Sequence, residues 1–262
     1  AADPTLPIAT RQPASLYGPL GVLVQALRAH NTTIANEPSE PNGIDKCFTL
    51  LNFGAMAEAK RCAANLASLY PQSKGQAQLQ AALAGFEGDF TTALSLMDLE
   101  NQIQAWNNAA VLQLNGRSEQ ALSIYQKLVP ELFVQPPVPG TSLYPGDTVA
   151  VGAALISTGA VKQAQQVLRL GIKDAAALPL AGQLGRRWSE VYAYALLAEY
   201  GNACEALAEA ADKGYFHNYL QLAVDPELAE LRQKHCFEKQ YGRIHAQAEA
   251  QVAAARKAGL LP

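Results

Sequence analysis

The cysteines and histidines are the residues of this sequence best suited to metal binding or nucleophilic chemistry, and there are four of each. Cys204, His217, His235 and Cys236 supply the ligand types of a zinc site. The adjacent residues 235 and 236, however, would project about 100° apart on a helix and cannot easily share one metal ion. We therefore expect no metal site.

Other patterns typical of enzymes are missing from the sequence. It contains no His-Glu-x-x-His, Gly-x-Ser-x-Gly, Walker or dinucleotide-binding motif. His30, His217 and His245 have no nucleophilic partner at a recognisable spacing. We expect these three side chains to be surface or capping histidines.

Pairs of carboxylates, the other common acid–base groups, fall where charge is ordinary on a helical protein. Asp98 with Glu100, and Glu227 with Glu230, are predicted at helix ends and on exposed faces. We therefore expect no catalytic residue and no cofactor, and a protein that works by binding. The alternative is an enzyme with a site near the proline-rich segment 130–147.

The four cysteines fall into two pairs that are close in sequence, although three connectivities are possible. Cys47 and Cys62 lie on opposite sides of a predicted turn at Gly54, and Cys204 precedes a tail that carries Cys236. We predict the disulfides Cys47–Cys62 and Cys204–Cys236, which would place the protein in an oxidising compartment such as the periplasm. The alternative is four small buried thiols in a cytosolic protein.

The composition bounds the function classes. The chain has 262 residues, of which 49% are hydrophobic, so it can bury a large core. A net charge of −3 leaves no basic excess for direct binding to nucleic acid. The longest apolar runs, such as Val149 to Ile156, are about half the length of a membrane span, so membrane attachment would need a segment outside this sequence.

The sequence is rich in alanine, and a recurring glycine–alanine spacing predicts its helices. A glycine is followed five residues later by an alanine, which predicts a turn and then a closely packed second helix. The pairs are Gly54 and Ala59, Gly88 and Ala93, Gly116 and Ala121, Gly159 and Ala164, and Gly201 and Ala206. First helices are predicted at 44–53, 76–86, 104–114, 147–157 and 187–200, which makes five hairpins.

The third hairpin resembles a tetratricopeptide repeat. The residues that carry the resemblance are Trp106-Asn107-Asn108-Ala109-Ala110, Gly116, Ala121-Leu122, Tyr125 and Leu128. The resemblance implies an all-α fold, an α-solenoid of about five irregular TPR-like helical hairpins with a C-terminal helical cap. We expect an N-terminal arm and capping helix in 1–43, the hairpins in 44–213 with the proline-rich insertion at 130–147, and capping helices in 214–262.

The tail carries a narrower resemblance. It extends over Ala206-Leu207, Gly214-Tyr215, Asp225-Pro226-Glu227-Leu228, Leu231-Arg232, Phe237 and Arg243. This pattern is similar to the end of periplasmic tetratricopeptide domains in membrane-anchored winged-helix transcriptional regulators. The resemblance implies a non-catalytic sensor or interaction domain, and a free periplasmic adaptor or assembly factor is the alternative.

The partner implied is a protein, a peptide or a small-molecule signal. Solenoids of this kind bind on the face formed by the first helix of each hairpin. Loops inserted between hairpins add to that face. The predicted binding residues are Asn52, Trp106, Asn107, Gln113, Tyr144, Arg186, Arg187, Trp188 and Tyr192.

Overall fold

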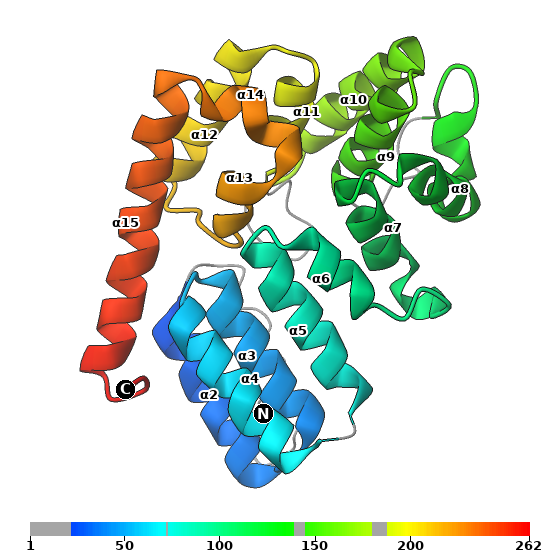
Figure 1. Cartoon of the computed structure of the whole chain (residues 1–262). Helices are drawn as coiled ribbons and strands as arrows, with labels where there is room; N and C mark the ends of the chain where they lie inside the picture. The colour runs from blue at the N-terminus through cyan, green and yellow to red at the C-terminus, as the bar shows by residue number, and fades with distance from the viewer. Residues whose placement is uncertain (1–21, 72, 139–144, 180–187) are drawn as a thin grey trace, which may run out of the picture.

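The computed structural model describes residues 22–71, 73–138, 145–179 and 188–262 (Figure 1). These residues form helices and no strands, so the all-α prediction is confirmed. The α-helices are α2 (Leu23–Asn36), α3 (Glu40–Asn52), α4 (Met56–Leu69), α5 (Lys74–Phe86), α6 (Phe90–Ser95), α7 (Ala105–Leu114), α8 (Ser118–Leu128), α9 (Pro145–Ser157), α10 (Val161–Ala175), α11 (Ser189–Leu196), α12 (Tyr200–Asp212), α13 (Leu220–Val224), α14 (Ala229–Arg232) and α15 (His235–Lys257). Short 3-10 turns are η1 (Gln102–Gln104), η2 (Pro130–Phe133) and η3 (Pro226–Leu228).

Consecutive helices pack as hairpins: α3 with α4, α5 with α6, α7 with α8, α9 with α10, and α11 with α12. The first four turns use the predicted glycines, since Gly54, Gly88, Gly116 and Gly159 have φ of 76°, 80°, 72° and 85°. This left-handed region is open to glycine without strain. At Gly54 there is also no room for a side chain, because an added Cβ would lie 2.6 Å from the ring of Tyr219.

The fifth hairpin turns at a different residue from the one predicted. Gly201 lies inside α12, and Ala198 takes the left-handed conformation with φ of 58°. The alanine five residues later, Ala203, is fully buried, so the turn-to-alanine spacing is kept but starts three residues earlier. The helix predicted over 187–200 is therefore two helices, α11 and the start of α12.

The proline-rich insertion is partly an ordered crossing. It opens with η2, whose Leu132 is fully buried, and the bond between Gln135 and Pro136 is cis. The amide of Gln163 in α10 donates to the carbonyl oxygen of Phe133 at 3.3 Å. Residues 139–144 lie outside the described ranges, and α9 begins at Pro145.

The third hairpin gives a direct test of the repeat register. Ala121 has no exposed surface and packs in one core with Ala109, Leu112 and Tyr125. Replacing Ala121 by Leu should overpack α7 against α8 and lower the free energy of unfolding by about 1–3 kcal/mol. Chemical denaturation measures this effect, with Ala253→Leu on the exposed face of α15 as the control; equal stability of the two variants would contradict the register.

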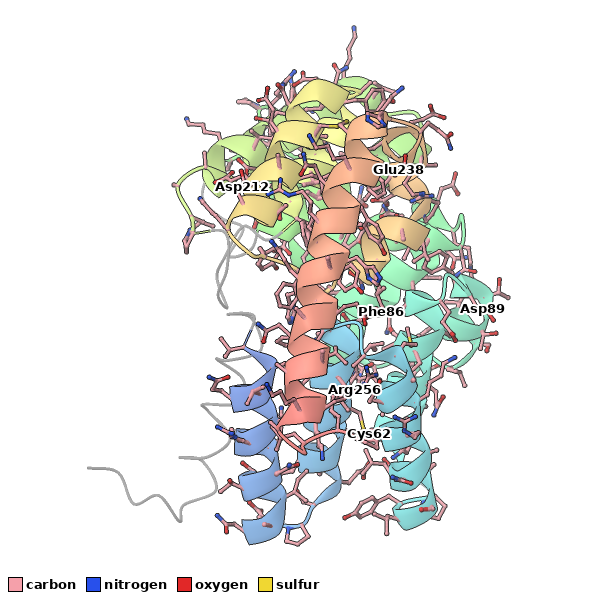
Figure 2. The ribbon with its side chains drawn as sticks, turned by 90° about the vertical axis from the view of Figure 1, so that its left-hand side faces the viewer. Cys62, Phe86, Asp89, Asp212, Glu238 and Arg256 are labelled. Atoms are coloured by element: carbon pink, nitrogen blue, oxygen red, sulfur yellow. A yellow bond between two sulfur atoms is a disulfide. The ribbon has the colours of Figure 1, made fainter. Side chains whose placement is uncertain are left out.

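The last helix joins the two ends of the chain. Helix α15, 23 residues long, packs against both α12 and α2, as Figure 1 shows along one side of the molecule. Residues from α2 to α5 and from Trp188 onward share one hydrophobic core. The guanidinium of Arg256 lies 2.6 Å from the carboxylate of Glu58, whose side chain is only 5% exposed. Figure 2 shows Arg256 and Cys62 near the C-terminal end of α15.

Both predicted disulfides are present. Cys47–Cys62 joins α3 to α4 with Cα atoms 5.5 Å apart, and Cys204–Cys236 joins α12 to α15 with Cα atoms 5.9 Å apart. Disulfides persist in oxidising compartments, so this pairing favours a location outside the cytoplasm. Among the described residues, no helix combines the length and the apolar character that crossing a bilayer requires.

Candidate functional site

Two residues of the predicted binding face hold the chain's own segment 217–227. The carbonyl oxygen of Asn52, at the end of α3, accepts a hydrogen bond from the backbone N–H of Asn218 at 2.8 Å. The indole N–H of Trp188 donates to the carbonyl oxygen of His217 at 2.8 Å. Trp188 is 6% exposed, so its role is that of a structural tryptophan under this segment.

Two more predicted residues bind the same segment further along. The amide of Gln113 in α7 donates a hydrogen bond from Nε2 to Oε1 of Glu227. The hydroxyl of Tyr192 in α11 donates to Oδ2 of Asp225 at 2.9 Å. The segment 217–227 therefore contacts the first, third and fifth hairpins on the face that we expected to be open.

The remaining predicted residues divide into two groups. Trp106 is half-buried and packs on Tyr125 with ring centroids 5.0 Å apart, whereas Asn107 is exposed on α7. The predicted residues that lie outside the described ranges are Tyr144, Arg186 and Arg187.

A cavity of about 850 Å³ lies beside the segment 217–227. It is bounded by the turn between α7 and α8, the C-terminal ends of α9 and α11, and residues 226 and 227. Its walls include Gln113, Arg117, Ser118, Glu119, Thr158, Leu196 and Glu227. We call this space the hairpin cavity. Its volume is in the range of about 300–1,000 Å³ usual for small-molecule sites.

Glu227 is held in the wall of the hairpin cavity by a helix cap. Oδ1 of Asp225 accepts a hydrogen bond from the backbone N–H of Glu227 at 2.9 Å and so caps η3, as the Asp-Pro pair predicts. Burial, and then the charge of Asp225, raise the pKa of Glu227 from 4.5 to about 8, although the hydrogen bond from Gln113 acts in the opposite direction. Glu227 is half-buried in the first turn of η3, so it lies at a helix end as predicted but is less exposed than expected.

The two carboxylates have little compensating positive charge. Burial raises the pKa of Asp225, against the hydrogen bonds from the Glu227 N–H and the Tyr192 hydroxyl and the charge of Arg232. Arg232 itself donates to the backbone carbonyl oxygens of Asp225, at 2.5 Å, and Leu222, at 3.4 Å. The guanidinium of Arg232 therefore donates its hydrogen bonds to backbone carbonyl oxygens and forms no ion pair with Asp225 or Glu227. A site with two carboxyl groups and no paired cation favours a ligand with a positive group.

Two buried polar atoms near Glu227 lack hydrogen bonds within the described part of the chain. Oε1 of Gln113, a residue only 9% exposed, has no donor, and the hydroxyl of Tyr125 has no partner. Burial, followed by the charges of Glu227 and Asp147, raises the pKa of Tyr125, so this phenol stays protonated. Buried polar groups without partners are uncommon, and they mark places where a ligand or water completes the hydrogen bonding.

The histidines are placed differently from expectation. His30 is 5% exposed in the middle of α2, with Nε2 at 2.8 Å from Oγ1 of Thr49, and His217 is 8% exposed. Both are buried, so the prediction of surface or capping positions is wrong for them. His245 is exposed on α15, and its Nδ1 lies 2.8 Å from the hydroxyl of Tyr219. Within the described ranges, no three His, Cys, Asp or Glu residues gather in a metal-binding group.

The sequence predicts Gln113 and Tyr192 as binding residues but does not predict their hydrogen-bond partners, Glu227 and Asp225. Asp225 and Glu227 directly precede the apolar residues Leu228 and Leu231, which could have indicated that this segment packs on the core. Both leucines are fully buried in the structure. The sequence matches no protein-family model and no curated protein. The relation to tetratricopeptide proteins therefore stays a resemblance carried by the repeat residues.

Proposed function

We propose that this chain is a non-catalytic binding domain, a solenoid of tetratricopeptide-like hairpins in an oxidising compartment such as the periplasm. Its site is the hairpin cavity, and its ligand carries an ammonium or guanidinium group. The observation that carries the proposal is that Glu227 and Gln113 line this cavity, and that the buried Oε1 of Gln113 has no hydrogen-bond donor among the described residues. Both side chains offer acceptors to a ligand that donates N–H groups.

Electrostatics supports a cationic ligand. Asp225 and Glu227 place two carboxyl groups in one half-buried site, where an ionised carboxylate without a cation beside it is costly. A bound cation would remove that cost and form charge-assisted hydrogen bonds, which are stronger than neutral ones. Arg117 and Glu119, both exposed, also line the cavity and contribute one charge of each sign.

The position of the site supports a sensor role. A ligand at Glu227 would touch the α7–α8 hairpin and the segment that leads into α14 and the C-terminal cap at once. Binding would therefore affect how this segment lies on the inner face. A sensor domain of a membrane-anchored transcriptional regulator is the role that the tail resemblance implies. A free adaptor of the same compartment is the other role, and the sequence encoded upstream of Ala1 separates them.

Titration of agmatine into the protein by calorimetry tests the proposal. Because Glu227 must lose its proton to pair with a cation, affinity should rise up to about tenfold per pH unit between about pH 6 and pH 8. Glu227→Gln should weaken binding at least tenfold at about pH 8 and remove the pH dependence. The matched control is Glu230→Gln, an exposed carboxylate three residues away, which should bind as the native chain does.

Two further results bear on this experiment. Equal affinity at both pH values, or equal binding by native and Glu227→Gln protein, would contradict a cation site at Glu227. A blocked arginine, with its backbone acetylated and amidated, tests whether the guanidinium may come from a peptide. If it binds like agmatine, an arginine-bearing peptide is the better ligand class, and if only agmatine binds, a free organic cation is.

A further inference from the structure

A second cavity lies beside the core that α2 to α5 share with the residues from Trp188 onward. It has a volume of about 460 Å³ and is formed by the end of α2, the facing sides of α3 and α4, and the last residues of the chain. Its apolar walls are Ile34, Leu50, Leu66, Leu69, Leu260 and Leu261. We call this space the terminal cavity. The disulfide Cys47–Cys62 holds α3 and α4 together at its base.

Among the described residues, one cation in the wall of the terminal cavity, Lys46, has no anionic partner. The ammonium of Lys46 is half-buried and donates to Oδ1 of Asn31 at 2.8 Å. In the described ranges no carboxylate lies within ion-pair distance of it, and burial lowers its pKa. A half-buried ammonium next to apolar walls is stabilised when an anion binds beside it.

The other charged side chains of the wall do not cancel the positive charge of Lys46. Arg61 lies 3.4 Å from the carboxylate of Glu58, which is already bonded to Arg256 at 2.6 Å. Among the charged side chains that line the cavity, Lys46 and Arg61 are cationic, and the one carboxylate, Glu58, is shared with Arg256 outside the cavity. An apolar space with a net positive edge fits a molecule with an alkyl chain and an anionic head.

We propose that the terminal cavity binds a single-chain anionic amphiphile of the fatty-acid type. The alkyl chain lies between α3, α4 and the C-terminal residues, and the carboxylate pairs with Lys46. The volume is in the usual range for small-molecule sites. This site is separate from the hairpin cavity, and its proposal does not depend on the ligand bound there.

Calorimetric titration with laurate below its micellar concentration tests the proposal. Affinity should rise roughly fourfold per methylene from decanoate to laurate, as expected for burial of an alkyl chain. Dodecanol, which has the chain without the charge, should bind at least tenfold more weakly than laurate. Lys46→Met replaces the ammonium by an apolar side chain of similar length. It should lower laurate affinity to the level of dodecanol and leave dodecanol binding unchanged.

The control for the charge is Lys127→Met on the exposed face of α8, which should bind laurate as the native chain does. A second variant, Leu69→Glu, changes a side chain that is 69% exposed at the edge of the cavity. It should fold normally and lose both laurate and dodecanol. The proposal is overturned by no saturable laurate binding, by no gain with chain length, or by equal laurate affinity in native, Lys46→Met and Leu69→Glu proteins.

Discussion

Replacing Cys204 and Cys236 together by alanine is expected to lower the free energy of unfolding by about 3–4 kcal/mol. The disulfide closes a loop of 32 residues between α12 and α15, and a cross-link over such a span restricts the unfolded chain by about this amount. It also holds α15 against the core that joins the two ends of the chain. Urea denaturation of oxidised native protein and of the double variant measures the effect.

Hydrogen exchange shows which helices lose stability when each disulfide is removed. Without Cys204–Cys236, amides of α15 should exchange faster, whereas removal of Cys47–Cys62 should affect α3 and α4 first, because that disulfide lies inside the first hairpin. Equal stability of the native chain with and without reductant would contradict both disulfides. That result would also remove the argument for an oxidising compartment.

Glu227→Gln is expected to stabilise the protein at high pH. The folded pKa of Glu227 is raised from 4.5 to about 8 by burial and by Asp225, so the folded state binds a proton that the unfolded state has lost between these values. The carboxylate therefore costs no stability below about pH 4.5, and its cost grows as the pH rises toward 8. The neutral amide avoids this cost, and the gain at about pH 8 should be roughly 2–4 kcal/mol.

The measurement is denaturation of native and Glu227→Gln protein at about pH 4.5 and pH 8 without ligand. The two proteins should be equally stable at the lower value and differ at the higher one. Glu230→Gln, on an exposed position, should match the native chain at both values. A Glu227→Gln variant that is less stable at about pH 8 would show that the carboxylate is not buried in the folded state.

The hairpins were predictable because their signals are local. A turn glycine and an alanine five residues later specify one close helix pair, and the four turns from Gly54 to Gly159 follow that rule. The rule placed the fifth turn at Gly201, although alanine at position 198 adopts the left-handed conformation there. A non-glycine residue in that conformation carries no marker in the sequence.

The disulfides were predictable for the same reason, because each joins elements expected to pack together. The site was only half predictable. Helical periodicity placed Gln113 on the inner face, and the cluster around Trp188 pointed to Tyr192, but their partners lie 114 and 33 residues further along the chain. Periodicity carries no information on such distant pairs. It also could not show that the tail would cover the inner face and bury Glu227.

The pKa of the Glu227 carboxyl group tests whether Glu227 is the anionic group of a cation site. Carbon-13 NMR of the labelled glutamate side chains, with Glu227 assigned from the Glu227→Gln spectrum, gives the value without and with saturating agmatine. We expect a pKa of about 8 in the free protein, because Glu227 is desolvated beside Asp225, and a fall of at least about one unit with the cation bound. A Glu227 pKa near 4.5 in the free protein, or one that agmatine does not change, would contradict it.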